Sequence, residues 1–364
     1  MEIERIGNLT VVMENPKSLF NYFGWPTVTR LQNGKLAVVA SGFRVSHVCP
    51  FGKTVISYSE DEGETYTNPA PVIDTVLDDR DGGILAFGEK NVIVTSFNNT
   101  IDFQKWILEH SDEGNTGTRA NDELKYAYFN RVSKEQEDEV LGPTFRVSND
   151  CGVTFGELHR APVTSPHGPC VLSDGSLLWV GSCFETENIN SVEHKPIRAY
   201  KILPDYQMEF LGEIEKIQGH FSCEPYAVEA CPGKVICHIR VQHGGLMTVF
   251  QSESYDQGKT WTTPHQLLAD VEGAPAHILK CSNGMLLMTY CKKTVPYGIC
   301  GRVSTDFGDS WSDAFSIYDN GGVSSDMGYP STVELKDGSM ATVFYAHTEP
   351  NMPARIFQQK WRLC

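Results

Sequence analysis

The 364-residue sequence lacks any run of about 18 consecutive apolar residues, so no segment predicts a membrane-spanning helix. Basic residues are scarce relative to acidic ones: 30 Lys and Arg stand against 46 Asp and Glu, a formal net charge of −16. This acidic excess repels phosphate backbones and anionic lipid surfaces. Nucleic acids and membranes are therefore not expected as partners.

Paired cysteine motifs are also missing. The eleven cysteines include no C-x-x-C pair and no His-rich spacing, and an odd number cannot all pair within one chain. This usage predicts buried thiols in a reducing compartment, and neither a disulfide scaffold, a metal site nor a bound cofactor. Residues 1–6 contain neither a basic region nor an apolar run, so we expect no secretory signal and a cytoplasmic location.

An eight-residue motif, Ser-x-Asp-x-Gly-x-Thr/Ser-aromatic, occurs four times. Its copies start at Ser59, Ser148, Ser254 and Ser304. A short Asp side chain can accept backbone N–H groups two residues on, and Gly tolerates positive φ, so each copy predicts a tight turn between two strands. We expect these turns at the outer rim of the fold, far from any chemistry.

A second repeat consists of an apolar residue pattern, a Gly turn and another apolar run. Its copies begin at Pro26, Gly83, Pro169, Pro225, Pro275 and Pro330. Successive starts are 57, 86, 56, 50 and 55 residues apart, and four of these intervals match one four-stranded blade. The sequence therefore predicts an all-β fold, a single six-bladed β-propeller domain that spans residues 1–364.

The one long interval contains about 30 extra residues between Asn98 and Gly142, which we interpret as an insertion at about 98–142. It is either a solvated loop or a segment that covers the axial pocket or forms a homo-oligomer contact. The N-terminal run from Ile3 to Met13 alternates like a strand and is expected to pair with the run from Arg355 to Trp361. Such pairing closes the ring and removes a sheet edge.

Residues just before the innermost strands of a propeller face one shared central pocket. In this sequence they are Trp25, Arg80, Asp81, His167, Glu224 and Tyr329. A blade needs none of these polar groups for packing, which makes them candidates for a site. For any one of them, a structural hydrogen bond remains the alternative.

The four motifs on a six-unit period resemble the Asp-boxes of sialidases, over essentially the whole chain. Cys223-Glu224-Pro225 followed by Arg240 looks like the sialidase pair of a glutamate and an arginine that binds the substrate carboxylate. Gly328-Tyr329-Pro330-Ser331 looks like the segment that carries the sialidase nucleophile. The resemblance implies that Tyr329 attacks the anomeric carbon and that Glu224 takes its phenolic proton.

The sequence departs from the sialidase pattern at three places. Gly24 stands where the first of three carboxylate-binding arginines is expected, with Trp25 beside it as an apolar platform for a sugar face, and Lys293 lies near the place of the third. Lysine keeps the charge but loses the bidentate fork of arginine. The loop after the first blade's second strand has no aspartate for acid–base catalysis, and His47 is the proton donor that we predict there. Arg44, on the same segment, is a candidate ligand of a substrate carboxylate.

Three functions follow from these residues. The first is a sialidase-like glycoside hydrolase that acts on a terminal acidic or modified sugar. The second is a lyase that acts on a uronate, in which Tyr329 or His47 removes a proton next to a carboxylate held by Arg44 and Arg240. The third is a glycan-binding propeller without catalytic activity. In all three the expected partner is a carbohydrate.

Overall fold

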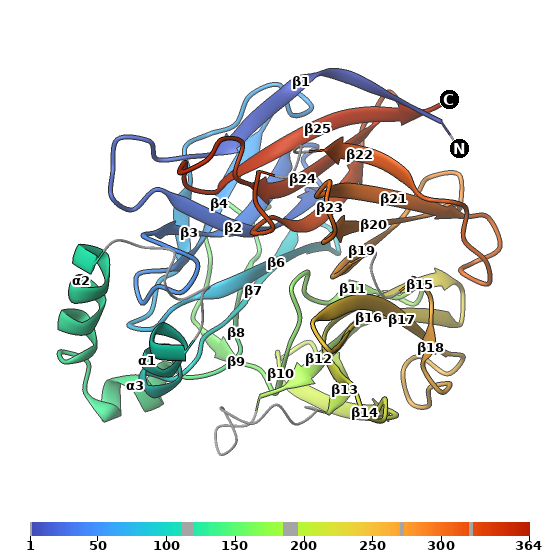
Figure 1. Cartoon of the computed structure of the whole chain (residues 1–364). Helices are drawn as coiled ribbons and strands as arrows, with labels where there is room; N and C mark the ends of the chain where they lie inside the picture. Colours follow the sequence, from blue (N-terminus) through green and yellow to red (C-terminus); the bar gives the residue numbers. More distant parts are fainter. Residues whose placement is uncertain (1, 111–118, 185–195, 270–272, 320–322) are drawn as a thin grey trace.

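The structure is a computed structural model that describes residues 2–110, 119–184, 196–269, 273–319 and 323–364. Six antiparallel sheets are arranged radially around an axis (Figure 1), as expected for a six-bladed β-propeller. The first strands of successive blades contact one another around this axis. The predicted fold class is confirmed.

Blades 1 to 3 occupy the first part of the chain. Blade 1 contains β2 (Tyr22–Arg30), β3 (Leu36–Arg44), β4 (Lys53–Ser59) and β5 (Ala70–Ile73), and blade 2 contains β6 (Arg80–Phe87), β7 (Asn91–Phe97), β8 (Thr144–Ser148) and β9 (His159–Arg160). Blade 3 contains β10 (Val163–Thr164), β11 (Cys170–Val171), β12 (Leu177–Cys183), β13 (Ile197–Ile202) and β14 (Met208–Ile214). Its innermost strand is broken in two, because β10 and β11 both pair with β12.

Blades 4 to 6 complete the ring. Blade 4 contains β15 (Phe221–Cys231), β16 (Lys234–His243), β17 (Leu246–Ser254) and β18 (His265–Gln266), and blade 5 contains β19 (Ala276–Lys280), β20 (Leu286–Lys292), β21 (Gly298–Ser304) and β22 (Phe315–Asp319). Blade 6 contains β23 (Gly328–Glu334), β24 (Met340–Ala346), β25 (Arg355–Leu363) and β1 (Ile3–Met13). The N-terminal strand thus supplies the outer strand of the last blade, with Ile3 opposite Leu363, as the sequence predicts. The two termini consequently lie side by side (Figure 1).

The second strand of each blade is buried on both faces, because blades pack face to face. In β3 the run Leu36–Ala40 is fully buried, and it follows the turn at Asn33–Gly34, where Gly34 has φ 88°. A continuous apolar run bounded by a turn signal is typical of such a strand. The cores therefore lie between neighbouring blades.

Each Asp-box motif forms the turn between the third and fourth strands of its blade, the two farthest from the axis. In the first copy, Asp61 accepts hydrogen bonds from Thr65 N (2.9 Å), Thr65 Oγ1 (2.6 Å) and Ser59 Oγ (2.8 Å). The Thr65 hydroxyl is the largest cause that lowers the pKa of Asp61 to about 2. The turn is therefore longer than a two-residue hairpin and is held by side chains. Its place at the rim agrees with the structural role predicted from the sequence.

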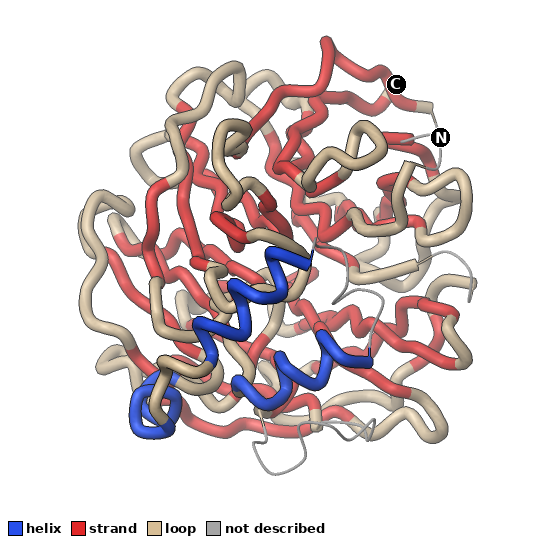
Figure 2. The backbone as a smooth tube through the Cα atoms, turned by 60° about the vertical axis from the view of Figure 1, so that its left-hand side comes forward, coloured by secondary structure: helices blue, strands red, loops and turns tan. Residues whose placement is uncertain are grey.

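The described residues between β7 and β8, inside the segment interpreted as an insertion, form three helices. They are α1 (Ile101–His110), α2 (Arg119–Phe129) and α3 (Lys134–Val140). Figure 2 shows them on one face of the ring of strands, with α1 and α2 in contact. Ser133 caps α3 by accepting from Gln136 N, and the Gln136 side chain accepts from Ser133 N. No helix in the described ranges is long and apolar enough to cross a membrane.

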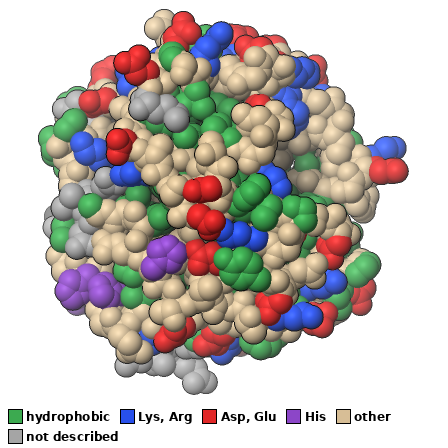
Figure 3. All heavy atoms as spheres, turned by 90° about the vertical axis from the view of Figure 1, so that its right-hand side faces the viewer, with side chains coloured by type: hydrophobic (Ala, Val, Ile, Leu, Met, Phe, Trp, Pro, Cys, Tyr) green, Lys and Arg blue, Asp and Glu red, His purple; other side chains and the backbone are tan. Residues whose placement is uncertain are grey.

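All eleven cysteines are free thiols in this structure, and seven of them are buried. Acidic and basic side chains are interspersed over the face shown in Figure 3, without a broad patch of one sign. A basic stripe of the kind that tracks a phosphate backbone is not visible on that face.

Candidate active site

Four blades present a side chain to the axial pocket through the same backbone irregularity. The strand register shifts next to Trp25 in β2, Asp81 in β6, Glu224 in β15 and Tyr329 in β23. Each of the four residues has a positive φ, between 48° and 56°. Only a few per cent of non-glycine residues have this conformation, and such strain occurs preferentially at active sites. All four side chains line one pocket of about 260 Å³.

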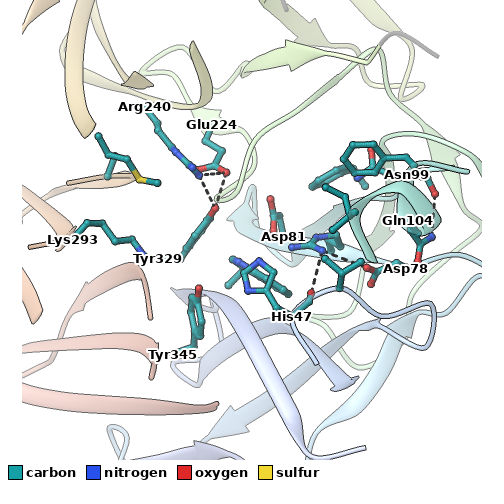
Figure 4. A pocket seen from close by; sticks show the side chains of 18 residues that line it. His47, Asp78, Asp81, Asn99, Gln104, Glu224, Arg240, Lys293, Tyr329 and Tyr345 are labelled. Atoms are coloured by element: carbon teal, nitrogen blue, oxygen red, sulfur yellow. Dashed lines mark hydrogen bonds and ion pairs between the residues drawn. The ribbon is translucent and has the colours of Figure 1, made fainter. Parts of the chain in front are cut away.

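Tyr329, Glu224 and Arg240 form one hydrogen-bonded group in this pocket (Figure 4). The Tyr329 hydroxyl donates to Glu224 Oε1 at 2.6 Å. Arg240 Nη1 donates to both Glu224 oxygens at 2.8 Å and to Tyr329 Oη at 3.3 Å. Burial raises the pKa of Tyr329 well above its ordinary value, and the negative charge of Glu224 adds to this effect. The Tyr329 hydroxyl is thus neutral at rest, and Glu224 already accepts a hydrogen bond from its proton.

His47 lies on the other side of the pocket, on the loop between β3 and β4 (Figure 4). Its Nδ1 is 2.9 Å from Oδ1 of Asp326, which precedes β23 in the chain. The ring of His47 packs edge-on against Trp25, with 4.9 Å between ring centroids. A histidine whose ring is held by a carboxylate at a pocket wall has the geometry of a proton-transfer group.

Asp81 is buried beside Arg80 at the bottom of the pocket. Burial raises the pKa of Asp81 to about 7; the negative charge of Glu224 adds to this shift, and Arg80 opposes it. Arg80 lines the pocket too, and its guanidinium carbon lies 4.2 Å from the ring centroid of Trp25, a cation–π contact. Trp25, next to Gly24 at the expected place of the first arginine, therefore has a guanidinium from blade 2 against its ring.

The insertion forms a wall of the pocket. Asn99, Phe103, Gln104 and Ile107 line it, the last three from α1, together with Met247 from blade 4. Of the alternatives left open by the sequence, the structure thus places part of this segment at the axial pocket. Residues 111–118 of the insertion lie outside the described residues, and its role as a homo-oligomer contact remains a prediction.

Lys293, the residue near the expected third arginine, also lines the pocket. Its Nζ donates to the backbone oxygens of Ser325 at 3.0 Å and Met327 at 2.6 Å. The ammonium group is thereby fixed next to the segment that carries Asp326 and Tyr329. It presents a point charge, in contrast to the flat fork of arginine.

Two predicted substrate ligands do not line the pocket. Arg44 is completely buried, and its Nη1 and Nη2 donate to the two oxygens of Asp78 at 2.5 and 2.9 Å. Its other donors go to Ser41, Ser46 and His47 within the same blade. The interpretation of Arg44 as a carboxylate ligand is therefore corrected: its fork is fully occupied by Asp78 and by the loop that carries His47.

His167 is the second correction. It is buried on the axis, 3.0 Å from Thr27 Oγ1, with its ring 4.9 Å from that of His277. Burial lowers the pKa of His167 well below its ordinary value, so the ring is neutral. The residue that corresponds to Tyr329 and Glu224 in blade 3 is Gly168, directly before Pro169 and with φ 80°. It has no side chain to offer to the pocket.

Several residues of the site were not singled out from the sequence. Asp326 orients His47, Tyr345 lines the pocket, and the α1 side chains close one wall. None belongs to a repeat, so periodicity gives no signal for them. Within the described residues, no group of three or more His, Cys, Asp or Glu side chains is arranged to hold a metal ion.

The six blades, the rim Asp-boxes and the tyrosine–glutamate–arginine group define a sialidase-type β-propeller. A sequence model of the BNR repeat-like domain matches residues 116–342, more than half of the chain. The protein belongs to this family. Comparison with the sequences of curated proteins finds no match.

Solved structures share the fold at low sequence identity. A protein of unknown function from Dyadobacter fermentans matches with a TM-score of 0.77 and 17% identity, over 100% of this chain and 99% of the other. The NanB sialidase of Streptococcus pneumoniae has a TM-score of 0.65 and 12% identity, over 96% of this chain and 70% of the other. The α-L-arabinofuranosidase Arb93A of Fusarium graminearum has a TM-score of 0.61 and 11% identity, over 98% of each chain. At these identities the likeness shows the fold alone.

Proposed function

We propose that the protein is a glycoside hydrolase of the sialidase type that removes a terminal acidic or otherwise modified sugar. The observation that carries this proposal is the 2.6 Å hydrogen bond from Tyr329 to Glu224 inside a pocket. A buried tyrosine with a raised pKa is a poor nucleophile unless a base accepts its proton as it attacks. Glu224 already has the geometry of that base, and a protein that only binds glycans does not need it.

The reaction proceeds in two steps. Tyr329 Oη attacks the anomeric carbon while its proton passes to Glu224, the bond to the leaving oxygen breaks, and His47 protonates that oxygen. Water then attacks the same carbon, His47 takes a proton from the water, and the released phenolate recovers its proton from Glu224. Arg240, within 3.3 Å of Tyr329 Oη, stabilises negative charge on this oxygen and on Glu224.

The walls of the pocket indicate the substrate class. At about 260 Å³ the pocket is smaller than the roughly 300–1,000 Å³ that drug-sized ligands occupy, which suits one terminal sugar ring. Arg80, Arg240 and Lys293 bring positive charge to its wall. Of the facing acids, Asp78 is paired with Arg44 and Glu224 with Arg240, and burial keeps Asp81 partly protonated near pH 7. Arg80 and Lys293 therefore supply the excess positive charge. The balance favours a sugar with an anionic group.

The test is a panel of aryl glycosides that differ in the sugar, read for aryl alcohol release together with an ultraviolet scan for unsaturated product. Tyr329→Phe and Glu224→Gln are each expected to lower turnover by at least about a hundredfold while the protein stays folded. Tyr255→Phe is the matched control, because Tyr255 is exposed (65%). An unsaturated product would establish a lyase instead, and specific binding without turnover would establish a glycan-binding propeller.

Common sialosides are expected to be poor substrates, with kcat/KM below about 10⁴ M⁻¹ s⁻¹. The reason is that Gly24 and Lys293 stand where two arginines with forked contacts to a carboxylate are expected. Loss of one such contact costs on the order of 1.5–3 kcal/mol, roughly ten- to a hundredfold in affinity. Faster cleavage of sialosides would contradict this interpretation of the replaced arginines.

A further inference from the structure

Asp326 collects four side-chain donors in one partly buried place. Its Oδ1 accepts from His47 Nδ1 (2.9 Å) and the Tyr345 hydroxyl (3.0 Å), and its Oδ2 accepts from the Tyr22 hydroxyl (2.9 Å) and His347 Nε2 (3.0 Å). Burial alone would raise the pKa of Asp326, but the two histidines hold it well below the ordinary value. The carboxylate is therefore ionised and acts only as an acceptor.

The two contacts of His347 fix its protonation. Its Nδ1 lies 2.6 Å from the backbone oxygen of Met352, and its Nε2 lies 3.0 Å from Asp326 Oδ2. A carbonyl oxygen and an ionised carboxylate can only accept, so both ring nitrogens must carry a proton. His347 is then an imidazolium ion. Its pKa is raised: burial alone would lower it, but the hydrogen bond to Asp326 and the charge of that residue overcome this effect.

The same reasoning fixes the tautomer of His47. Its Nδ1 faces Asp326 Oδ1, and the Tyr22 oxygen lies 3.2 Å away on the same side. Tyr22 has one hydroxyl proton and gives it to Asp326, so its oxygen can only accept from His47. Nδ1 of His47 must therefore carry the proton. In the proposed reaction the proton is then exchanged at Nε2.

We infer that Asp326 is the positioning residue of His47, and that His347 acts through Asp326 to set the pH range in which His47 exchanges its proton. This inference rests on the proposed role of His47 in the reaction. Asp326 holds the ring in one tautomer and one orientation. His347 neutralises Asp326, so the carboxylate that His47 contacts belongs to an ion pair and is not a bare negative charge.

Charged and titratable groups face the two histidines from several elements. Asp326, Tyr22, Tyr345 and Glu349 surround His347, and Asp326, Tyr22, Arg44, Arg80 and Asp78 surround His47 and its loop. Arg44 and Arg80 donate to the backbone oxygen of His47 and share Asp78, so substitution of His347 leaves them unchanged. The largest change at His47 then comes from the uncompensated charge of Asp326.

The first experiment does not depend on activity. Long-range ¹H–¹⁵N correlation spectra of the histidine rings are recorded from pH 5 to 9, with assignments from His47→Gln and His347→Gln. We expect the pattern of a doubly protonated ring for His347 at pH 7, and Nδ1–H for neutral His47. A neutral His347 at pH 7, or neutral His47 with its proton on Nε2, would overturn the inference even if the protein is an active glycosidase. The expected patterns without any turnover would contradict the proposed function alone.

The second experiment is kinetic, on the best substrate of the panel. His347→Gln keeps a donor for Asp326 but removes the positive charge. The limb of the kcat-against-pH profile that is assigned to His47 should therefore move to higher pH by on the order of one unit. Asp326→Asn removes the negative charge and the orientation, so the limb should move to lower pH and kcat should fall at least about tenfold with little change in KM. His265→Gln is the control: His265 is an exposed histidine beside an acid, Glu253, on the outer strand β18. If both variants lose the same share of kcat at every pH, without a shift of the pH profile, Asp326 and His347 have only a structural role.

Discussion

Arg44 provides the sharpest test of how this site is built. Its guanidinium and the carboxylate of Asp78 are 0% and 1% exposed and are joined by two hydrogen bonds. A Cβ on Gly52 would collide with both groups, so the pair is also tightly enclosed. Arg44→Met leaves Asp78 buried with only the weaker contacts to Arg80 and Cys49 N, both longer than 3.2 Å. Breaking a buried pair in this way costs about 3–5 kcal/mol.

This loss of folding free energy corresponds to a change in melting temperature. Unfolding entropy is about 2.1 cal/mol/K per residue, which comes to about 0.76 kcal/mol/K for 364 residues. The expected fall in Tm is therefore about 4–7 °C by calorimetry. Arg198→Met is the matched control, because the Arg198–Glu213 pair is exposed (37% and 47%) and should contribute less than about 1 kcal/mol.

The double variant Arg44→Met/Asp78→Leu removes both charges and should recover much of the loss. In the single variant kcat should also fall, because Arg44 Nη2 holds the backbone oxygen of His47 at 2.7 Å. An unchanged Tm together with a raised KM for an anionic substrate would refute this reasoning. It would show that Arg44 contacts the substrate, as the sequence alone suggested.

Three further predictions concern the rim, the pocket carboxyl group and the wall. Asp256→Ala removes the acceptor of two hydrogen bonds from Thr260, so it should cost about 2 kcal/mol of stability and lower Tm by about 3 °C while kcat stays unchanged. A loss of activity with an unchanged Tm would contradict the structural role of the rim turn. Asp81 keeps its proton up to about pH 7 in the folded protein but loses it near pH 4 in the unfolded chain, so the free energy of unfolding should fall as pH rises between these values. In denaturation curves at pH 4 to 8, Asp81→Asn should reduce this fall by on the order of 3 kcal/mol. The same pH dependence in both proteins would contradict the raised pKa. Ile107→Ala should raise KM about fivefold at similar kcat by removing roughly 1 kcal/mol of apolar contact, and an unchanged KM would place the substrate away from α1.

The fold could be predicted because its signals repeat. The Asp-box needs a particular order of short polar residues and glycine to close its turn, and four copies establish the period without any structure. Four of the six residues before the innermost strands that were taken as site candidates are at a positive-φ position, and these are Trp25, Asp81, Glu224 and Tyr329. A proline or glycine directly after each of them marks the irregularity in the sequence.

The same rule explains why the prediction that His167 lines the pocket was wrong. The proline of blade 3 is Pro169, so the position with positive φ falls on Gly168, and His167 points to the polar interior of the axis. A shift of one residue in a strand moves a side chain to the other face. The prediction for Arg44 was wrong for a different reason. Its partner Asp78 is 34 residues away, and nothing in the sequence distinguishes an arginine paired with a buried acid from one that binds a substrate. Asp326 and α1 belong to single-copy segments, where no period helps.

The two kinds of positive-φ position in this propeller separate stability from chemistry. At the rim, the two residues that follow the Asp of each motif have positive φ, as do Glu62 and Gly63 after Asp61. Hydrogen bonds to the side chains of Ser59 and Asp61 hold this strained backbone. At the axis, the strained residues are Trp, Asp, Glu and Tyr, which would each be relieved by replacement with glycine at the loss of the side chain. Strain of about 1–3 kcal/mol at each position persists only where the surrounding structure enforces it. Four large or ionisable side chains held this way in one pocket are hard to explain by packing, because a strand without the irregularity would pack as well. The backbone thus points independently to Tyr329 and Glu224, the nucleophile and the base of the proposed reaction, and to two residues that line the pocket beside them.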